Sequence, residues 1–280
     1  MSVDFAFIDS GTGGLPYMKY LTEHYPSSSC IYVADAKNFP YGEKTQQQVT
    51  DCALALCKVV IERFNPKVIV VACNTMSVTA LMELRKNFPI PFIGTVPAIK
   101  LAAKVTKNKR IGLLATQRSV TSPYTANLIK DFASDCAVFS RGDGKLISFI
   151  EQNLTNPNEE EKLNACKNAV EFFKENDCDT IILGCTHFIH VANQIQKLAG
   201  PEVQVIDSRD GVVRQALKMR GKISGELPEG IANQTFYVTG FPEGSTEEDY
   251  KSIAKMQNIP WGGQLGKLGK LGNLGKLGNL

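Results

Sequence analysis

Short hydrophobic runs alternate with longer segments of helical periodicity along most of the chain. Nine of these runs are rich in β-branched or aromatic residues and predict strands at residues 5–8, 31–34, 68–71, 92–93, 111–114, 137–140, 180–183, 203–206 and 236–238. Strands that alternate with helices are typical of parallel sheets joined by crossover helices. The pattern therefore predicts the α/β fold class.

The segment between the second and third predicted strands shows helical spacing. Its apolar residues recur every three or four positions and line one helical face, at Val49, Ala53, Leu56, Val60 and Phe64. Asn65-Pro66 ends the pattern. Cys52 and Cys57 lie in this helix, and we expect both to fill the core.

The chain also repeats itself loosely. Residues 69–75 resemble residues 181–187 at an offset of 112, and residues 5–10 resemble residues 111–116 at an offset of 106. Two such matches in the same order predict two related halves. The repeat places Cys73 and Cys185 at equivalent positions, each just after a strand. Ligands of open α/β sheets bind outside the carboxyl ends of strands, so the two cysteines could face one cleft.

Composition places the chain among ordinary globular proteins. Its 280 residues correspond to about two domains. The 31 basic and 28 acidic side chains leave a net charge of +3, which gives no electrostatic reason to expect nucleic acid as a partner. No apolar run approaches the roughly 18 residues of a membrane span. The N-terminal residues lack the basic and apolar parts of a signal peptide, so we expect a cytoplasmic protein without a membrane partner.

The eight cysteines form no Cys-x-x-Cys pair, so neither a disulfide framework nor zinc spacing is visible. Any chemistry that they perform should be thiol chemistry.

From Gly262 the composition changes to Gly-Lys-Leu and Gly-Asn-Leu triplets. Glycine at every third position disfavours a helix, so residues 262–280 are predicted to be a disordered tail outside the functional fold.

The first candidate for chemistry is the glycine-rich segment 9–15, which lies between a predicted strand and a predicted helix. Its glycines let the backbone approach a ligand, and the N–H groups of the following helix could bind an anion such as a carboxylate. The spacing matches neither phosphate-binding motif, and a plain turn remains the alternative.

The two cysteine segments are the next candidates. Cys73 could be an inert core residue, although Asn74 and Thr75 would supply donors to a small polar ligand at the end of the strand. Cys185, two residues before His187, suggests a thiol nucleophile, although side chains at that spacing need not touch. Zinc binding by these residues with His190 is not expected without a second ligand cluster. His190 is interpreted as a surface residue of the following helix.

Two further segments have less specific patterns. The turn that holds Tyr41 and Gly42 is mainly structural in its proline and glycine pattern, but its hydroxyl and N–H groups could close over a small ligand. Glu151 taken alone is one of 28 acidic residues and is predicted to be a solvated charge.

Five motifs together give a specific resemblance. They are Asp-Ser-Gly-Thr-Gly-Gly-Leu at residues 9–15, Ala-Asp-x4-Pro-Tyr-Gly-x-Lys at 34–44, Ala-Cys-Asn-Thr at 72–75, Leu-Gly-Cys-Thr-His at 183–187 and Ile-Asp-Ser at 206–208. In this order they resemble the glutamate racemases of the cofactor-independent aspartate/glutamate racemase superfamily. The resemblance runs from about residue 5 to about residue 256.

The resemblance implies two similar α/β lobes, each a mostly parallel sheet flanked by helices, with the active site in the cleft between them. The expected lobes are residues 1–95 with 208–261, and residues 96–207. It implies Cys73 and Cys185 as paired acid and base, with Asp9, Glu151 and His187 as the polar residues that tune them. It also implies substrate contacts from Asp9, Ser10, Tyr41, Gly42, Asn74, Thr75, Thr186 and His187.

The same resemblance implies racemisation of glutamate without cofactor or metal, the supply of D-glutamate for peptidoglycan, and a homodimer as one form of assembly. The residues agree with this chemistry, because inversion of a stereocentre needs proton carriers on opposite faces of the carbon. A free thiol has a pKa of about 8.5, so one sulfur could rest as thiolate and the other as thiol.

The chain also departs from the family pattern. It has Thr95-Val96-Pro97 in place of Glu-Pro, Phe188-Ile189-His190 in place of Tyr-Pro-Leu, and Arg209 in place of glycine. These differences leave open racemisation of aspartate or another acidic amino acid. A catalytically silent binding protein and a Cys-His thiol hydrolase are the alternatives from other classes, and the hydrolase would not need Cys73.

Overall fold

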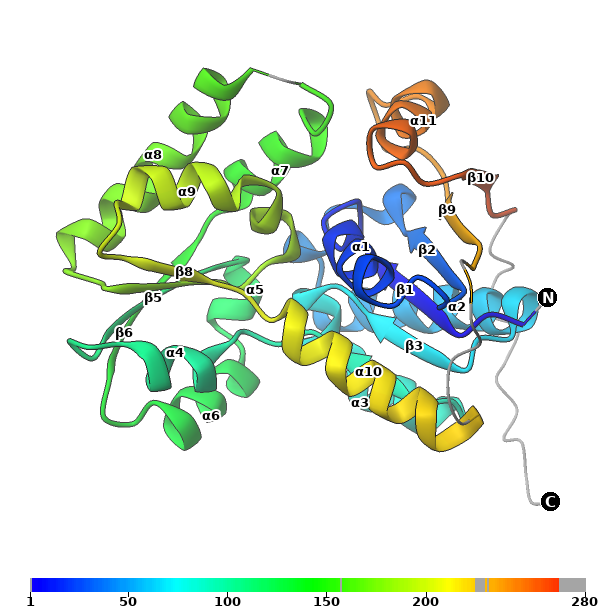
Figure 1. Cartoon of the computed structure of the whole chain (residues 1–280), viewed down its shortest axis with the longest axis horizontal. Coiled ribbons are helices and arrows are strands. Elements are labelled where there is room, and N and C mark those ends of the chain that lie inside the picture. Colours follow the sequence, from blue (N-terminus) through cyan, green and yellow to red (C-terminus); the bar gives the residue numbers. More distant parts are fainter. Residues whose placement is uncertain (1, 157, 225–229, 231, 267–280) are drawn as a thin grey trace.

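Two parallel sheets form the two lobes of the molecule (Figure 1). The computed structural model describes residues 2–156, 158–224, 230 and 232–266. The first sheet has six strands in the order β10-β9-β2-β1-β3-β4, and the second has four in the order β6-β5-β7-β8. Every pairing is parallel. The α/β class with two similar lobes is thereby confirmed.

The first sheet is built from the N-terminal strands and two strands from the end of the chain. Its strands are β1 (Phe5–Asp9), β2 (Cys30–Ala34), β3 (Val68–Val71), β4 (Phe92–Gly94), β9 (Gln234–Val238) and β10 (Trp261–Gln264). Its helices are α1 (Leu15–His24), α2 (Gln46–Phe64), α3 (Asn74–Asn87), α10 (Arg209–Ser224) and α11 (Glu247–Met256). The central strands β1 to β3 are buried along their whole length, as expected for a parallel sheet covered on both faces.

Alternation along β1 divides the first lobe into two cores. Phe5 and Phe7 pack on the side of α1, whereas Ala6 and Ile8 pack on the side of α2. Helix α2 begins with a capping box at Thr45 and ends at Asn65, whose backbone is left-handed. Its predicted apolar face is buried. Cys57 is fully buried as expected, whereas the neighbouring Cys52 is only half-buried against the same core.

The second sheet holds β5 (Arg110–Ala115), β6 (Ala137–Gly142), β7 (Thr180–Leu183) and β8 (Gln204–Ile206). Its helices are α4 (Ile99–Val105), α5 (Gln117–Val120), α6 (Pro123–Phe132), α7 (Gly144–Gln152), α8 (Glu159–Glu175) and α9 (Ala192–Ala199). Three short 3-10 helices, η1 (Ala36–Asn38), η2 (Tyr41–Glu43) and η3 (Thr186–Val191), follow strands β2 and β7. Figure 1 shows the second lobe beside the first, with α10 running from the second lobe along the first.

The strand register reproduces the sequence repeat. The order β2-β1-β3-β4 of the first sheet matches β6-β5-β7-β8 of the second. Phe5 of β1 faces Val68 of β3, and Ile111 of β5 faces Thr180 of β7. These pairs are separated by the offsets of 106 and 112 that the sequence shows. Each lobe therefore contains its own copy of the same four-strand arrangement. The lobe boundaries predicted at residues 95/96 and 207/208 stay predictions.

The predicted tail begins later than expected. Residues 261–264 form β10 beside β9, and the Leu265 N–H donates to the Val238 carbonyl. The Leu265 side chain is buried in the core on the α2 side. The prediction of disorder from Gly262 is therefore wrong for residues 262–266, because an edge strand and one buried leucine hold them. The rest of the predicted tail, residues 267–280, lies outside the described residues.

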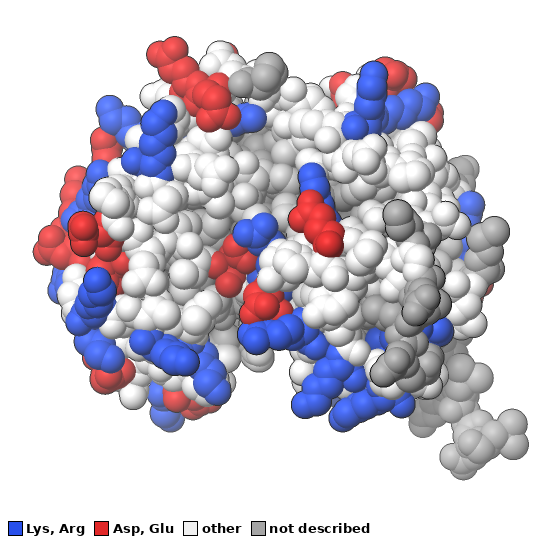
Figure 2. Space-filling view, viewed as in Figure 1, with Lys and Arg blue, Asp and Glu red and all other residues white. Residues whose placement is uncertain are grey.

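Positive and negative side chains are interspersed on the face that Figure 2 shows, without a large field of one sign. Among the described residues, no helix combines the length and hydrophobicity needed to cross a membrane.

Candidate active site

A small cavity between the lobes contains both repeated cysteines. It has a volume of about 80 Å³ and is lined by Cys73 after β3 and by Cys185 after β7. Each cysteine is 5% exposed. Other predicted residues line the same cavity: Ser10, Tyr41, Gly42, Asn74, Thr75, Thr186 and His187. The two remaining predicted residues, Asp9 and Glu151, do not line the cavity but contact residues that do.

Cys73 caps the first turn of α3. Its sulfur accepts a hydrogen bond from the Met76 N–H at 3.5 Å and lies 3.7 Å from the Ser10 hydroxyl. Burial, together with the negative charge of Asp9, raises the pKa of the Cys73 thiol well above its usual value. These surroundings therefore favour the neutral thiol at Cys73.

Asp9 ends β1 and is fully buried. Its carboxylate accepts hydrogen bonds from the Ser10 and Gly14 N–H groups, both at 2.6 Å, and from the Tyr32 and Thr186 hydroxyls, both at 3.2 Å. Burial raises the pKa of the Asp9 carboxyl to about 6, although the charge of His187 and the hydrogen bonds act against this rise. Asp9 thus connects the glycine-rich loop of the first lobe to the Thr186 segment of the second.

The glycine-rich loop binds carboxylates, but these belong to the protein itself. The Gly14 N–H donates to Asp9, and the Thr12 N–H donates to Glu151 at 3.0 Å. A Cβ on Gly13 would lie 2.5 Å from the Nδ1 atom of His187. Glycine is therefore required where this loop approaches the second lobe, and the predicted anion site is occupied from within.

Glu151, His187 and Cys185 form a buried chain. The Nε2 atom of His187 lies 2.8 Å from the Glu151 carboxylate, and its Nδ1 atom lies 3.8 Å from the Cys185 sulfur. Burial opposes the charge on His187, but its hydrogen bonds to Cys185 and Glu151 and the negative charge of Glu151 hold its pKa well above the usual value. These contacts therefore favour the protonated, positively charged form of His187 beside Cys185.

Glu151 lies on α7 and differs from the solvated charge that its position alone predicts. Its carboxylate accepts from the N–H and the hydroxyl of Thr12 and contacts His187. Burial acts against its charge, yet these hydrogen bonds and the charge of His187 keep the pKa of Glu151 below its usual value. The prediction of a solvated side chain is wrong because the opposite lobe supplies its donors.

Asn74 presents an amide without a protein partner. Its side chain is 2% exposed and lines the cavity, and neither its amide nitrogen nor its oxygen has a hydrogen bond. A buried amide without partners carries a desolvation cost that a bound polar ligand would remove. Close to it, the hydroxyls of Thr75 and Thr116 lie 3.0 Å apart across the two lobes.

Tyr41 has a different role from the one that its hydroxyl suggested. The hydroxyl donates to Asp35 at 2.6 Å, and Asp35 also accepts from Asn38 and Thr239. The ring of Tyr41 and the adjacent Gly42 still line the cavity. The hydroxyl therefore holds the turn in place, and the wall of the cavity comes from the rest of the residue.

The sequence interpretation missed several residues of the site. Thr116 lines the cavity, and the repeat contained a signal for it, because the offset of 106 pairs it with Ser10. Thr12 lies inside a recognised motif, but nothing in the motif singles out its bonds to Glu151. Tyr32, which donates to Asp9, had no signal in the sequence.

His190 is not the surface residue that we expected. It lies in η3, is partly buried, and its Nε2 atom is 3.2 Å from the Thr12 carbonyl oxygen. Among the described residues, no group of three or more His, Cys, Asp or Glu side chains has the arrangement of a metal site.

Comparison with known proteins finds that nearly the whole chain is similar to one family of enzymes. The profile of the Asp/Glu/hydantoin racemase family matches residues 17–216. Glutamate racemase of Treponema pallidum is 39% identical over 264 residues, which cover 93% of this chain and 96% of that protein. Glutamate racemase of Actinobacillus pleuropneumoniae is 34% identical over 91% of this chain and 93% of that protein. The Escherichia coli glutamate racemase, solved with L-glutamate and the activator UDP-MurNAc-ala, superposes with a TM-score of 0.80 at 28% identity, covering 94% and 97% of the two chains.

Proposed function

The chain belongs to the Asp/Glu/hydantoin racemase family, and on that premise we propose that it interconverts L- and D-glutamate by proton transfer between Cys73, the α-carbon and Cys185. The observation that carries the proposal is the shared cavity, to which equivalent strands of the two lobes bring one sulfur each. Inversion at a carbon needs a base on one face and an acid on the other, and a pair of sulfurs from opposing lobes supplies both.

The protonation states suggest how a cycle begins. Cys73 starts as a neutral thiol, because burial and Asp9 raise its pKa. Cys185, beside the imidazolium of His187, is then the first base. It removes the α-proton, and the Cys73 thiol delivers its own proton to the opposite face. The thiolate then resides on Cys73, and reaction of the other enantiomer or proton exchange with water restores the starting state.

The carbanion needs stabilisation beyond the two thiols. A positioned acid or base contributes on the order of 10² to 10⁴ in rate, which is small for so weak a carbon acid. Ser10, Asn74, Thr75 and Thr186 line the cavity, and the free amide of Asn74 can donate to a substrate carboxylate without losing a protein contact. The hydroxyls of Ser10 and Thr186 contact Asp9 and that of Thr75 contacts Thr116, so each donates to the substrate by turning from its present partner. As charge moves from the α-carbon onto the carboxylate oxygens, these donors stabilise the enediolate.

The proposal extends to the setting of the reaction. The Escherichia coli relative was solved with L-glutamate, which supports a small amino acid as the substrate. We assign to the chain the supply of D-glutamate for peptidoglycan, a cytoplasmic location, and catalysis without cofactor or metal. A homodimer is the assembly that the resemblance implies, and light scattering of the purified chain tests it.

The direct experiment follows the α-proton. The purified chain is incubated with L-glutamate or D-glutamate in D₂O, and deuterium at the α-carbon and optical rotation are measured together. Both enantiomers should gain deuterium and converge on the racemate. If aspartate reacts and glutamate does not, the substrate is corrected and the mechanism is retained. If neither amino acid exchanges its α-proton, the racemase proposal fails.

A thiol hydrolase is the second candidate, because Cys185, His187 and Glu151 are aligned as nucleophile, base and orienting acid. This reading leaves Cys73 without a role. The hydrolase hypothesis predicts that an activated ester acylates Cys185 and that the Cys73→Ser variant hydrolyses the ester as fast as the wild type. If Cys73→Ser loses the activity of the wild-type protein, the hydrolase is excluded.

A further inference from the structure

His190 forms a contact between the lobes that the proposed proton transfer does not use. Its Nε2 atom lies 3.2 Å from the carbonyl oxygen of Thr12, in the glycine-rich loop of the opposite lobe. A carbonyl oxygen can only accept a hydrogen bond, so the imidazole must carry a proton on Nε2. The contact therefore excludes the neutral tautomer that carries its proton only on Nδ1.

The accepting residue belongs to the buried chain that ends at Cys185. Thr12 donates from its N–H and from its hydroxyl to the Glu151 carboxylate. Glu151 contacts His187, which in turn contacts the Cys185 sulfur. The next residue, Gly13, packs so closely that a Cβ there would meet the His187 ring. The orientation of the Thr12 backbone thus affects both Glu151 and His187.

The surroundings of His190 favour its neutral form. Burial, together with the positive charge of His187, lowers the pKa of His190 to about 4, although the Thr12 carbonyl and the Glu151 charge act in the opposite direction. Arg209 also lies near enough to disfavour a second positive charge. At neutral pH the ring can therefore hold the Thr12 carbonyl without competing with His187 for the negative charge of Glu151.

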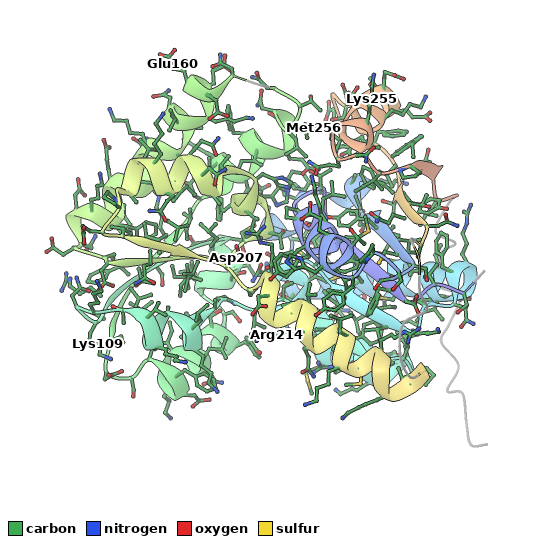
Figure 3. The ribbon with its side chains drawn as sticks, viewed as in Figure 1. Lys109, Glu160, Asp207, Arg214, Lys255 and Met256 are labelled. Atoms are coloured by element: carbon green, nitrogen blue, oxygen red, sulfur yellow. The ribbon has the colours of Figure 1, made fainter. Side chains whose placement is uncertain are left out.

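The other side of the His190 residue borders a cavity. This cavity has a volume of about 170 Å³ and is also lined by Ile150 of α7, Lys162 of α8 and Met256 at the end of α11. Figure 3 shows Met256 on the part of α11 that faces the second lobe. Lys162 is the charged residue on this side.

We propose that His190 is a positioning residue for the Cys185 half of the site, since its Nε2–H bond fixes the Thr12 backbone that holds Glu151 and, through it, His187. The proposal deepens the function proposed above and rests on it.

Two substitutions separate the hydrogen bond from packing. His190→Leu keeps an apolar side chain and removes the donor, whereas His190→Gln places an amide N–H near the position of Nε2. A lost hydrogen bond corresponds to about a three- to tenfold change. We expect kcat for glutamate to fall by about that factor in His190→Leu with little change in KM, and to stay within about twofold in His190→Gln. His24→Gln, at an exposed histidine of α1, is the matched control and should leave kcat unchanged.

Nitrogen-15 NMR of labelled histidine supplies a readout without substrate. The chain has only three histidines, at positions 24, 187 and 190, so their signals can be assigned from the variants. His190 should be neutral with its proton on Nε2, and the His187 signals should shift in His190→Leu but remain near their wild-type positions in His190→Gln. A purely structural role of His190 would not produce this pattern.

The NMR and kinetic results together support or overturn the positioning role of His190. A neutral His190 with its proton on Nδ1 overturns the proposal, as does a folded His190→Leu variant with wild-type kcat and unshifted His187 signals. If that variant does not fold, the tautomer in the wild type and the His190→Gln measurements decide. If wild-type protein fails to racemise glutamate, the proposed function falls, while the NMR result still tests the link from His190 to His187.

Discussion

The two lobes share their backbone and differ in the groups beside their sulfurs. Equivalent strands, β3 and β7, end at Cys73 and Cys185, and the neighbouring strands β1 and β5 are equivalent too. By the same offsets Asp9 of the first lobe corresponds to Ala115, and His187 of the second corresponds to Thr75. A carboxylate therefore accompanies one thiol and an imidazolium accompanies the other.

This difference shows how a repeated fold can perform a two-sided reaction. The repeat brings both cysteines into the lining of one cavity, and the proposed inversion needs one sulfur on each face of the α-carbon. A symmetric environment would leave both thiols in the same protonation state at rest. Burial, together with Asp9, raises the pKa of Cys73, whereas His187 brings a positive charge to Cys185. The proposed mechanism uses this difference, with Cys73 as the first acid and Cys185 as the first base.

The largest expected effect comes from removing either sulfur. Cys73→Ser and Cys185→Ser should each lower kcat by at least about 10² to 10⁴, because a serine hydroxyl is a far weaker acid and base than a thiol. Conversion of each glutamate enantiomer, followed by circular dichroism, measures the loss. Cys136→Ser, outside the cavity, is the control and should retain activity. Full activity in either cavity variant would contradict a symmetric requirement for the two thiols.

Removing the positive group of the second lobe should have the next largest effect. We expect His187→Gln to lower kcat for glutamate by about 10², because the positive group beside Cys185 is lost.

In Glu151→Gln the negative charge that raises the pKa of His187 disappears, so the His187 ring should lose its proton at lower pH. The alkaline limb of the kcat/KM profile should move to lower pH in this variant.

The enantiomers of glutamate have equal free energies, so kcat/KM must stay equal in the two directions in every variant of this series. Unequal changes can appear only in kcat and KM taken separately. A measured inequality in kcat/KM would indicate an experimental error or a second reaction, and an unmoved pH profile in Glu151→Gln would contradict the role of Glu151.

The negative group of the first lobe should have a smaller and opposite influence. Asp9→Asn removes a charge that raises the pKa of Cys73, so this thiol should ionise at lower pH. Alkylation of Cys73 by iodoacetamide, quantified by mass spectrometry across pH, measures the shift. We expect kcat to fall by about tenfold. If the alkylation profile of Cys73 moves to higher pH, the electrostatic assignment of Asp9 is wrong.

The smallest effect should come from the contact between Thr75 and Thr116. Thr116→Val removes a hydroxyl that lies 3.0 Å from Thr75 and that also caps α5 by accepting from the Ser119 N–H. We expect kcat to fall by about threefold from the lost contact with Thr75, and the lost cap to lower the stability of the fold by about 1 kcal/mol. Thr121→Val is the matched control, because its hydroxyl is exposed and donates only to the Gln117 carbonyl of the preceding turn. Equal kinetics of the two variants would remove Thr116 from the site.

Much of the fold follows from patterns that a few neighbouring residues determine. All nine predicted strands occur, and the apolar face of α2 is buried as its spacing indicated. β10 escaped prediction because its sequence, with two glycines, does not have the composition of a strand. Its place in the sheet depends on pairing with β9 and on the burial of Leu265.

Local patterns alone predicted the site only where a motif follows a strand. The two cysteine segments could be placed at strand ends, and the repeat indicated that they were equivalent. Glu151 entered the predicted site only through the family resemblance, because its donor Thr12 is 139 positions away and no local pattern distinguishes it from the other acidic residues. The Tyr41 hydroxyl and His190 likewise have partners that no local pattern specifies.

The sequence by itself determined the α/β class, the loose repeat between two halves and the two thiols at strand ends, because periodicity and strand boundaries depend on each segment and the face that it buries. The tertiary structure alone decided that Thr12 binds Glu151 and that His190 contacts the Thr12 carbonyl. Those two contacts join residues of opposite lobes, and their hydrogen-bond geometry depends on how the lobes pack rather than on the order of residues in either one.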